Sequence, residues 1–312
     1  MALDKDVATL LRAMSEQGLR SFEQLSVAEA RQVVSTFVGL QAPPQDVAEV
    51  WETTYLSDGL TVPLSVYVPD GNRPHPVVLY FHGGGFVAGD LAVVDEPARS
   101  VANGAEVIVV TASYRRAPEY RFPTAVEDCW AALGWVVDNV ARYGGDPQNI
   151  VLMGDSAGGN LAAVTALQVR DHGVSALRGQ ILIYPIIDPA ADFPSRGAFA
   201  AGPLLTGAGL DWFWQQYLNG PEDAKNPYAV PTNAARFDGL PPTLLLTTEN
   251  EVCRDEAEHY GDLLRDSGVH VRSRRFDGLI HGVFWMSAAV PRSVELLSEI
   301  VSFIASTSHQ PR

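Results

Sequence analysis

The sequence is poor in cysteine, with only two in 312 residues, Cys129 and Cys253. Neither belongs to a C-x-x-C pair or to a cysteine and histidine spacing of the kind that binds zinc. The chain therefore lacks the pattern of a disulfide framework and of a structural metal site. We expect both cysteines to be free thiols, and the sequence motifs imply neither a metal ion nor an organic cofactor.

Long apolar stretches are also missing. The longest runs, such as residues 181–187, are far shorter than the roughly 20 residues that a membrane-spanning helix needs. The first residues, MALDKDVATLLRAMSEQ, mix acidic and apolar groups and lack the basic start and apolar centre of a signal peptide. We therefore expect a soluble, cytoplasmic protein with no membrane partner.

Positive charge is in short supply. The chain has 22 lysines and arginines against 37 aspartates and glutamates, which gives a formal net charge of -15. A field of that sign repels phosphate backbones, so nucleic acid is excluded as a partner. Hydrophobic residues make up 46% of the chain and charged residues 19%, a balance that is typical of a folded globule.

Short apolar segments that resemble buried strands alternate with helix-patterned segments along most of the chain. The expected strands are residues 77–81, 107–112, 150–153, 181–184, 243–248 and 269–276. A hairpin precedes them, with strands over residues 50–56 and 60–68 joined by the turn Ser57-Asp58-Gly59. This alternation predicts an α/β fold with a mostly parallel central sheet of about eight strands, helices on both faces and the hairpin at its leading edge.

Two segments fall outside this alternation. Between residues 10 and 38 apolar side chains recur every three or four positions, which predicts two amphipathic helices, the second capped by Ser26 with Glu29 three residues on. Between residues 184 and 243 a stretch rich in small residues and prolines precedes an aromatic helix near residues 210–218. A structureless loop of that length is unusual, so this stretch is expected to be a lid over a site.

Residues 154–158 read G-D-S-A-G and match the G-x-S-x-G motif. An apolar strand precedes the motif and a helix pattern over residues 160–169 follows it, which is the context that the motif needs. Glycines beside the serine let the tight turn close and let a substrate approach its hydroxyl. The motif predicts that Ser156 is a nucleophile; the alternative is that these small residues only cap the following helix.

A glycine-rich loop, residues 82–86 (H-G-G-G-F), directly follows the strand at 77–81. Its glycines allow backbone N–H groups to converge on one point, as an oxyanion hole requires. We assign Gly83 and Gly84 to that hole, together with the amide of Ala157. A phosphate or dinucleotide loop is the rival interpretation, but residues 83–89 fit neither G-x-G-x-x-G nor the Walker pattern.

Ser156 lies 73 residues after Gly83 (156 minus 83), and these two motifs resemble those of the hormone-sensitive lipase family, the bacterial type IV esterases of the α/β-hydrolase fold. Similar family segments are residues 113–119 (S-Y-R-R-A-P-E, with Arg116 where leucine is usual), Phe122-Pro123, Asp128, Tyr184-Pro185 and residues 281–284 (H-G-V-F). The matches span residues 79–284, most of the chain. The resemblance implies an N-terminal helical cap (1–45), a catalytic α/β-hydrolase domain (46–188 and 241–312) and an inserted cap segment (189–240).

The resemblance also implies a catalytic triad in the chain order serine, acid, histidine. His281 is the expected base, because it follows a strand pattern and lies in a loop from which an imidazole could take the proton of Ser156. The family usually has aspartate in a D-P-L-x-D-E pattern where this chain reads E-V-C-R-D-E at residues 251–256. Glu251 is therefore the expected acid, with Asp255 and Glu249 as alternatives.

The aromatic helix near residues 210–218 suggests where an acyl group would bind, since ligand pockets are mostly apolar. We expect Phe213 and Trp214 to line such a pocket together with Phe86 and Phe284, each of which lies beside a catalytic motif. The alternative is that the helix simply packs on the body of the protein.

These features predict a serine carboxylesterase that acts on short to medium acyl esters of small molecules through an acyl-enzyme. The same triad could act on an amide, a carbamate or a lactone, because fold and triad do not set the leaving group. A non-catalytic small-molecule binding protein is the alternative from another class: plant gibberellin receptors resemble this family but lack its catalytic histidine, and His281 argues against that reading. Family members often pair, so a homodimer is possible.

Overall fold

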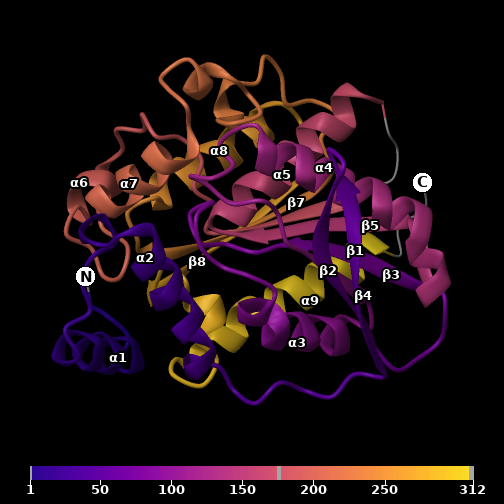
Figure 1. The fold of residues 1–312 in the computed structure, drawn as a ribbon, viewed down its shortest axis with the longest axis horizontal. Helices are drawn as coiled ribbons and strands as arrows, with labels where there is room; N and C mark the ends of the chain where they lie inside the picture. The colour runs from indigo at the N-terminus through magenta and orange to yellow at the C-terminus, as the bar shows by residue number, and fades with distance from the viewer. Residues whose placement is uncertain (1, 174–176, 309–312) are drawn as a thin grey trace.

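The computed structural model describes residues 2–173 and 177–308. Eight strands form one sheet in the order β1-β2-β4-β3-β5-β6-β7-β8 (Figure 1). The strands are β1 Glu49–Ser57, β2 Leu60–Val68, β3 His75–Phe81, β4 Ile108–Ala112, β5 Gly145–Asp155, β6 Leu177–Ile183, β7 Thr243–Asn250 and β8 Val271–Ile280. β2 runs antiparallel to both of its neighbours, and the pairs from β4 to β8 are parallel. The predicted α/β fold is confirmed and each predicted strand is present, although β5 begins five residues earlier and β8 ends four residues later than expected.

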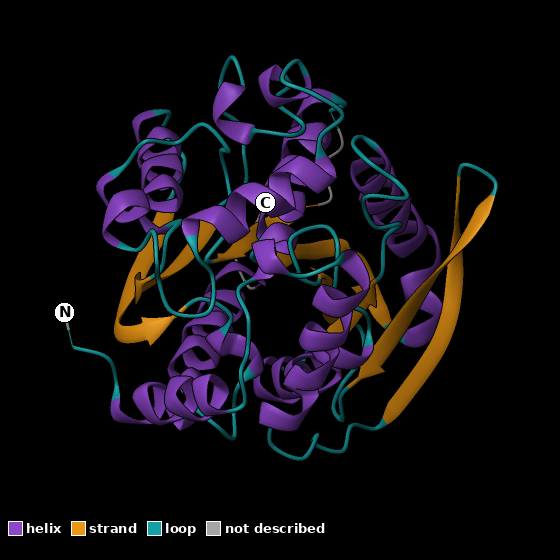
Figure 2. Cartoon of the chain, turned by 60° about the vertical axis from the view of Figure 1, so that its left-hand side comes forward, coloured by secondary structure: helices purple, strands orange, loops and turns teal. Residues whose placement is uncertain are grey.

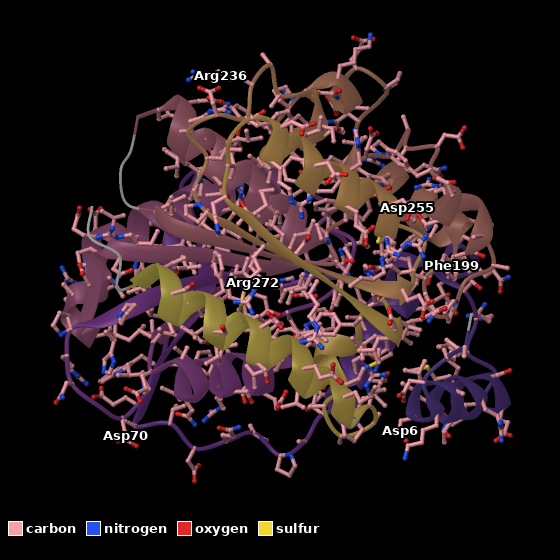
Figure 3. The ribbon with its side chains drawn as sticks, turned by 180° about the vertical axis from the view of Figure 1, so that it is seen from behind. Asp6, Asp70, Phe199, Arg236, Asp255 and Arg272 are labelled. Atoms are coloured by element: carbon pink, nitrogen blue, oxygen red, sulfur yellow. The ribbon has the colours of Figure 1, made fainter. Side chains whose placement is uncertain are left out.

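Helices cover both faces of the sheet. The helices are α1 Lys5–Glu16, α2 Val27–Ser35, α3 Asp95–Ala105, α4 Thr124–Asn139, α5 Ala157–Asp171, α6 Pro194–Ala198, α7 Gly207–Tyr217, α8 Arg254–Asp266 and α9 Val294–Ser308. α3 and α9 pack together on one face, which Figure 3 shows from behind, and α4, α5 and α8 lie on the other. Because helices shield both faces from water, the central strands contain runs of buried apolar residues, such as 77–81, 108–110 and 150–153.

The hairpin at the sheet edge follows from its turn residues. Asp58 and Gly59 both have positive φ, 49° and 72°, the backbone that a two-residue hairpin loop requires. β1 pairs with β2 over its whole length, from Glu49 opposite Val68 to Ser57 opposite Leu60. The predicted hairpin and its position at the edge of the sheet are therefore confirmed.

The N-terminal segment contains the two predicted helices, α1 and α2, and two 3₁₀ turns, η1 Phe22–Gln24 and η2 Thr36–Leu40. Ser26 and Glu29 form the predicted capping box at the start of α2. The amide of Asp4 donates a hydrogen bond of 3.0 Å to the carbonyl of Gly278 in β8. This contact holds the start of the chain against the far edge of the sheet.

The segment between β6 and β7 contains α6 and α7, and these two helices lie on the same side of the molecule as α1 and α2 (Figures 1 and 2). The two segments touch: the rings of Phe22 and Phe213 are 5.0 Å apart between centroids. The hydroxyl of Thr206, which caps α7, also donates to Glu23 at 3.0 Å. The N-terminal segment and the segment between β6 and β7 therefore meet beside the sheet.

Both cysteines are buried and free, as the sequence predicted. Within residues 2–173 and 177–308, none of the helices has the length and apolar character needed to cross a bilayer.

Candidate active site

Ser156 lies on the sharp turn between β5 and α5, with φ of 55° and ψ of -119°. This backbone is strained for a residue with a side chain, and such strain is common at functional sites. Gly154 and Gly158 make the turn possible, because a Cβ on Gly154 would overlap the carbonyl of Gly158, and one on Gly158 would overlap that of Phe81. The motif glycines are therefore required by close backbone packing around Ser156.

The pairing of β7 with β8 places an acid next to a histidine. Asn250, the last residue of β7, pairs with Ile280, the last residue of β8. The residues that follow, Glu251 and His281, are therefore neighbours although 30 positions separate them. The strands run parallel, so both side chains emerge at the carboxyl edge of the sheet, the edge at which Ser156 also lies.

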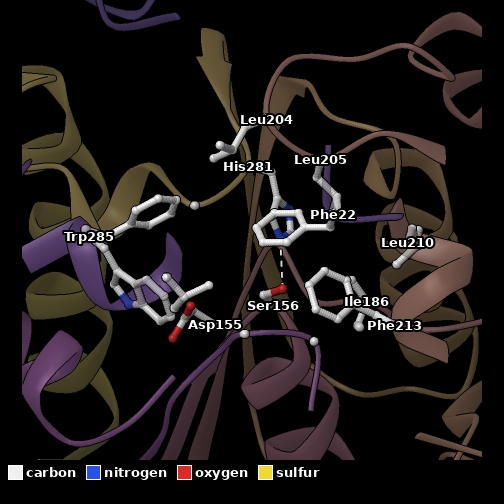
Figure 4. Close-up of a pocket in the computed structure, with 15 residues that line it drawn as sticks. Phe22, Asp155, Ser156, Ile186, Leu204, Leu205, Leu210, Phe213, His281 and Trp285 are labelled. Atoms are coloured by element: carbon white, nitrogen blue, oxygen red, sulfur yellow. Dashed lines mark hydrogen bonds between the residues drawn. The ribbon is translucent and has the colours of Figure 1, made fainter. Parts of the chain in front are cut away.

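Hydrogen bonds connect these three side chains. His281 Nε2 is 2.8 Å from Ser156 Oγ (Figure 4), and His281 Nδ1 is 2.8 Å from Glu251 Oε2. An ionised carboxylate only accepts hydrogen bonds, so Nδ1 carries the proton and Nε2 is free to accept from the serine hydroxyl. The second carboxylate oxygen of Glu251, Oε1, accepts from the amide of Thr248 at 2.8 Å. The carboxylate is thus held at both oxygens.

The two alternative acids have other partners. Asp255 accepts from the amide of Ser195, in the segment between β6 and β7, and from Arg254, at 2.8 and 2.7 Å. Glu249 accepts from the amide of Gly278 at 2.8 Å. Among the described residues, the carboxylate in contact with His281 is that of Glu251.

The free amides of the glycine loop differ in one residue from those that were assigned from the sequence. The amide of Gly83 donates to Asp155 Oδ1 at 3.1 Å, so this N–H is already used. The amides of Gly84 and Gly85 donate no hydrogen bond within the described part of the chain, and both residues line the pocket that contains Ser156. The assignment of Gly83 to an oxyanion hole has to be corrected: the free donors of this loop lie one residue later.

A third free amide comes from the first turn of α5. Ala157 is the first residue of that helix, and helix geometry leaves its N–H without a partner inside the helix. Among the described residues, the N–H groups of Gly84, Gly85 and Ala157 thus have no hydrogen-bond partner, and all three belong to the backbone around Ser156. Such donors can stabilise negative charge that develops on a bound carbonyl oxygen.

Asp155 is a buried carboxyl, and in the sequence it is only the variable residue before the serine of the G-x-S-x-G motif. Burial raises its pKa to about 7, while hydrogen bonds from Tyr80 at 2.7 Å and from Gly83 act in the opposite direction. Trp285 in turn donates to the Tyr80 hydroxyl at 3.3 Å. This network joins the glycine loop to the turn that carries Ser156, and no local sequence signal pointed to it.

An apolar pocket opens above Ser156 and His281, with an empty volume of about 520 Å³ including the part open to solvent (Figure 4). Its walls come from three parts of the chain. They are Phe22, Val34 and Phe37 of the N-terminal segment, Leu204, Leu205, Leu210 and Phe213 of the inserted segment, and Ile186 and Trp285 of the sheet domain. The sequence did not predict that the N-terminal residues line a pocket, because they belong to an ordinary amphipathic pattern.

Of the four aromatic residues expected to line this pocket, Phe213 does so. The expectation has to be corrected for the others. Phe86 is buried and stacks on Tyr217, with 3.8 Å between ring centroids, while Trp214 and Phe284 border two other cavities. The physical reason for the helix residues is periodicity: Phe213 lies on the face of α7 that turns toward Ser156, and the next residue is rotated by about 100°.

Cys253 lies behind the histidine. Its Sγ is 3.5 Å from His281 Nδ1 and 3.6 Å from Glu251 Oε2. Burial, and then the neighbouring Glu251 carboxylate, raises the pKa of this thiol well above its usual value, so it carries its proton. The sequence indicated only a free thiol at this position, because nothing local placed it beside the histidine.

Comparisons with known proteins agree with this architecture. Residues 78–285 match the family model described as alpha/beta hydrolase fold. The chain is 39% identical over 263 residues to the carboxylesterase NlhH of Mycobacterium tuberculosis (strain ATCC 25618 / H37Rv), which covers 82% of each chain. It is 30% identical over 316 residues to the gibberellin receptor GID1 of Oryza sativa subsp. japonica, covering 97% of this chain and 85% of the receptor.

The structure is also similar to that of a solved enzyme, the hyperthermophilic esterase from the archaeon Pyrobaculum calidifontis. The TM-score is 0.92 at 36% sequence identity, and the match covers 98% of this chain and 99% of the esterase. The fold, the motifs and these similarities together establish that the chain belongs to the alpha/beta hydrolase fold family, in the hormone-sensitive-lipase-like group that its two glycine motifs predicted.

Proposed function

We propose that this protein hydrolyses carboxylic esters of small molecules, with Ser156 as nucleophile, His281 as general base and Glu251 as the acid of the triad. The observation that carries the proposal is the continuous set of hydrogen bonds from Ser156 through His281 to Glu251 at the floor of an apolar pocket. A base in contact with a nucleophile, and itself oriented by a third group, is the arrangement that activates serine in acyl transfer.

The reaction begins when His281 Nε2 takes the proton of Ser156 Oγ as the oxygen attacks the ester carbonyl. The tetrahedral intermediate then collapses, and the protonated Nε2 gives its proton to the departing alcohol, leaving the acyl group on Ser156. A water molecule then attacks this acyl-enzyme while the same nitrogen takes its proton. The second tetrahedral intermediate collapses, the protonated Nε2 returns that proton to Ser156 Oγ, and the carboxylic acid is released. Each of the two half-reactions, acylation and deacylation, therefore returns His281 to its starting form.

Glu251 acts through the histidine. Its carboxylate accepts the Nδ1 proton, which keeps Nε2 available as an acceptor and stabilises the imidazolium that forms during each transfer. Glutamate is one methylene longer than the aspartate usual at this position in the family. The hydrogen bond from the Thr248 amide fixes the far oxygen of this longer side chain and directs Oε2 at the imidazole.

The amides of Gly84, Gly85 and Ala157 are proposed to hold the oxyanion. Their being unpaired supports this role, and so does the presence of Gly84 and Gly85 in the pocket wall. Losing one such donor typically costs roughly 3 to 4 kcal/mol of transition-state stabilisation. Gly83 contributes differently: its amide anchors the loop to Asp155.

The pocket supports an apolar acyl group of short to medium length. Its walls suggest that residues 1–45 and 189–240 act as a cap over the catalytic domain (46–188 and 241–312), since both supply apolar side chains above Ser156. The cytoplasmic location and the homodimer expected from the sequence stay predictions.

The test is hydrolysis of p-nitrophenyl acetate, butyrate and octanoate by the wild type and by Ser156→Ala. We expect kcat to fall by at least about 10⁴-fold, since removing a triad serine leaves only binding and oxyanion stabilisation. Ser298→Ala, which removes an exposed hydroxyl bonded only to its own helix, is the matched control and should keep full activity. Near-normal turnover by Ser156→Ala would exclude the proposed nucleophile.

A binding protein of the same fold is separated from an enzyme by covalent labelling. A fluorophosphonate should label the wild type at Ser156 and leave Ser156→Ala unlabelled. If the wild type neither reacts with this probe nor hydrolyses any of the three esters, the receptor-like alternative is favoured. Amide, carbamate and lactone substrates in the same assay test whether the triad serves another acyl bond.

A further inference from the structure

Three buried side chains behind the proposed nucleophile could act together as metal ligands. Glu251 Oε2, Cys253 Sγ and His281 Nδ1 lie within 4.8 Å of one another. Glu251 and Cys253 come from the loop between β7 and α8, and His281 follows β8. The proposed hydrolysis uses the carboxylate and the imidazole but gives no role to the thiol. Carboxylate, thiolate and imidazole are the three ligand types that zinc takes in proteins.

The distances between these atoms are close to those of a tetrahedral site. With Zn–S, Zn–N and Zn–O bonds of about 2.3, 2.05 and 2.0 Å, tetrahedral angles put sulfur about 3.5 Å from both nitrogen and oxygen, and nitrogen about 3.3 Å from oxygen. The observed separations are 3.5 Å for Sγ to Nδ1, 3.6 Å for Sγ to Oε2 and 2.8 Å for Nδ1 to Oε2. If Nδ1 and Oε2 moved about half an ångström further apart, all three separations would match a tetrahedral zinc site.

We propose that Glu251, Cys253 and His281 form an inhibitory binding site for a thiophilic divalent cation, Zn²⁺ or Cd²⁺, with a water molecule as the fourth ligand. The charges support it, because one thiolate and one carboxylate neutralise a divalent cation in a buried place, where an uncompensated charge is costly. Calcium and magnesium are disfavoured, since both prefer oxygen ligands.

Binding of the cation and catalysis by the triad exclude each other. When the metal–sulfur bond forms, the thiol proton leaves to solvent. When Nδ1 binds the metal it cannot keep its proton, so the neutral imidazole carries the proton on Nε2, the nitrogen that faces Ser156. An Nε2–H donates and cannot take the serine proton. The inhibition rests on the proposed function, whereas the binding does not.

The experiment is a titration of the untagged protein with CdCl₂, followed by the ultraviolet charge-transfer band of the cadmium–thiolate bond. We expect one equivalent of Cd²⁺ per chain to saturate the band in the wild type. Ser156→Ala should show the same band, because that variant keeps all three ligands. This measurement stands whether or not the protein proves to be an esterase.

Two cysteine variants separate the site from adventitious binding. Cys253→Ser keeps a small side chain that can donate a hydrogen bond but removes the soft ligand, so the band should disappear and Cd²⁺ affinity should fall by at least about 100-fold. Cys129→Ala removes the other buried thiol, which belongs to no such cluster among the described residues, and should keep the band. A band that survives in Cys253→Ser, or that is lost in Cys129→Ala, would overturn the assignment.

Inhibition provides the second readout. Zn²⁺ or Cd²⁺ should abolish ester hydrolysis by the wild type and by Cys129→Ala, and EDTA should restore it. Cys253→Ser, compared with its own metal-free rate, should need at least about 100-fold more metal for the same inhibition. Equal sensitivity of Cys253→Ser and the wild type would show that the metal acts elsewhere.

Discussion

Glu251→Gln is the sharpest test of how the triad is built, because the surroundings of the carboxylate dictate how the new amide must sit. Oε1 of Glu251 accepts from the Thr248 amide at 2.8 Å, and Oε2 faces His281 Nδ1 at 2.8 Å. Only the oxygen of glutamine can accept from Thr248, so its NH₂ group must turn toward the imidazole. Nδ1 then has to accept, and the imidazole proton moves to Nε2.

The variant therefore keeps the shape of the site but holds the base in the wrong tautomer. In serine proteases the equivalent loss lowers kcat by about 10⁴-fold. That factor corresponds to about 5 kcal/mol, since each 1.36 kcal/mol changes a rate tenfold. We expect kcat for p-nitrophenyl butyrate to fall by this order, with KM changed far less because no substrate contact is removed.

The matched control is Glu249→Gln, the same chemical change two residues earlier. Glu249 accepts from the Gly278 amide and, within the described chain, makes no contact with His281, so the control should keep kcat within about threefold. Asp255→Asn tests the other alternative acid and should behave in the same way. If Glu251→Gln retained more than a tenth of the wild-type kcat, or if either control lost activity as severely, Glu251 would not be the triad acid.

Two further predictions concern the pocket and the buried charge. Phe213→Ala removes a ring from the pocket wall and leaves room for a longer acyl chain. The ratio of kcat/KM for the octanoate ester to kcat/KM for the butyrate ester should therefore rise about tenfold, which corresponds to the burial of about two more methylene groups. Trp214→Phe changes a residue outside this pocket and should leave the ratio unchanged. Burial raises the pKa of Glu256 to about 8. In the unfolded chain the Glu256 carboxyl loses its proton near its ordinary pKa, whereas in the folded protein it keeps the proton up to the raised pKa. The free energy of unfolding of the wild type should therefore fall as pH rises from about 4.5 to 8, and that of Glu256→Gln should fall less over the same range. Urea unfolding at pH 5 and 8 measures the difference, and identical pH slopes would refute it.

Local sequence predicted the elements that depend on neighbours in the chain. The turn Asp58-Gly59 and the capping box of Ser26 and Glu29 are short-range interactions, so their residues alone indicate them. The position of Ser156 could be predicted for the same reason, because the strand, the strained turn and the helix around it are contiguous in the sequence. His281 and Glu251 were expected from their order and from the family resemblance, whereas their contact depends on the pairing of Asn250 with Ile280 across two strands.

The same distinction explains the misassigned residues. Which glycine amide is free depends on Asp155, which lies 72 residues beyond Gly83 and whose carboxyl binds the Gly83 amide. Which aromatic residues line the pocket depends on the rotation of α7 against the sheet and on Phe22, a residue of the N-terminal segment that is distant from α7 in the sequence. The local pattern of a glycine run is the same whichever of its amides is free, and that of an aromatic helix is the same whichever of its rings faces the pocket.

The sequence by itself determined the class of the fold, the nucleophile motif and the chemical types available at the site, because each is set by residues adjacent in the chain. The tertiary structure alone decided which carboxylate reaches His281, which amides remain unpaired and which thiol lies beside the imidazole. Those contacts join residues far apart in sequence, and they exist only because strand register and helix packing bring them within hydrogen-bonding distance.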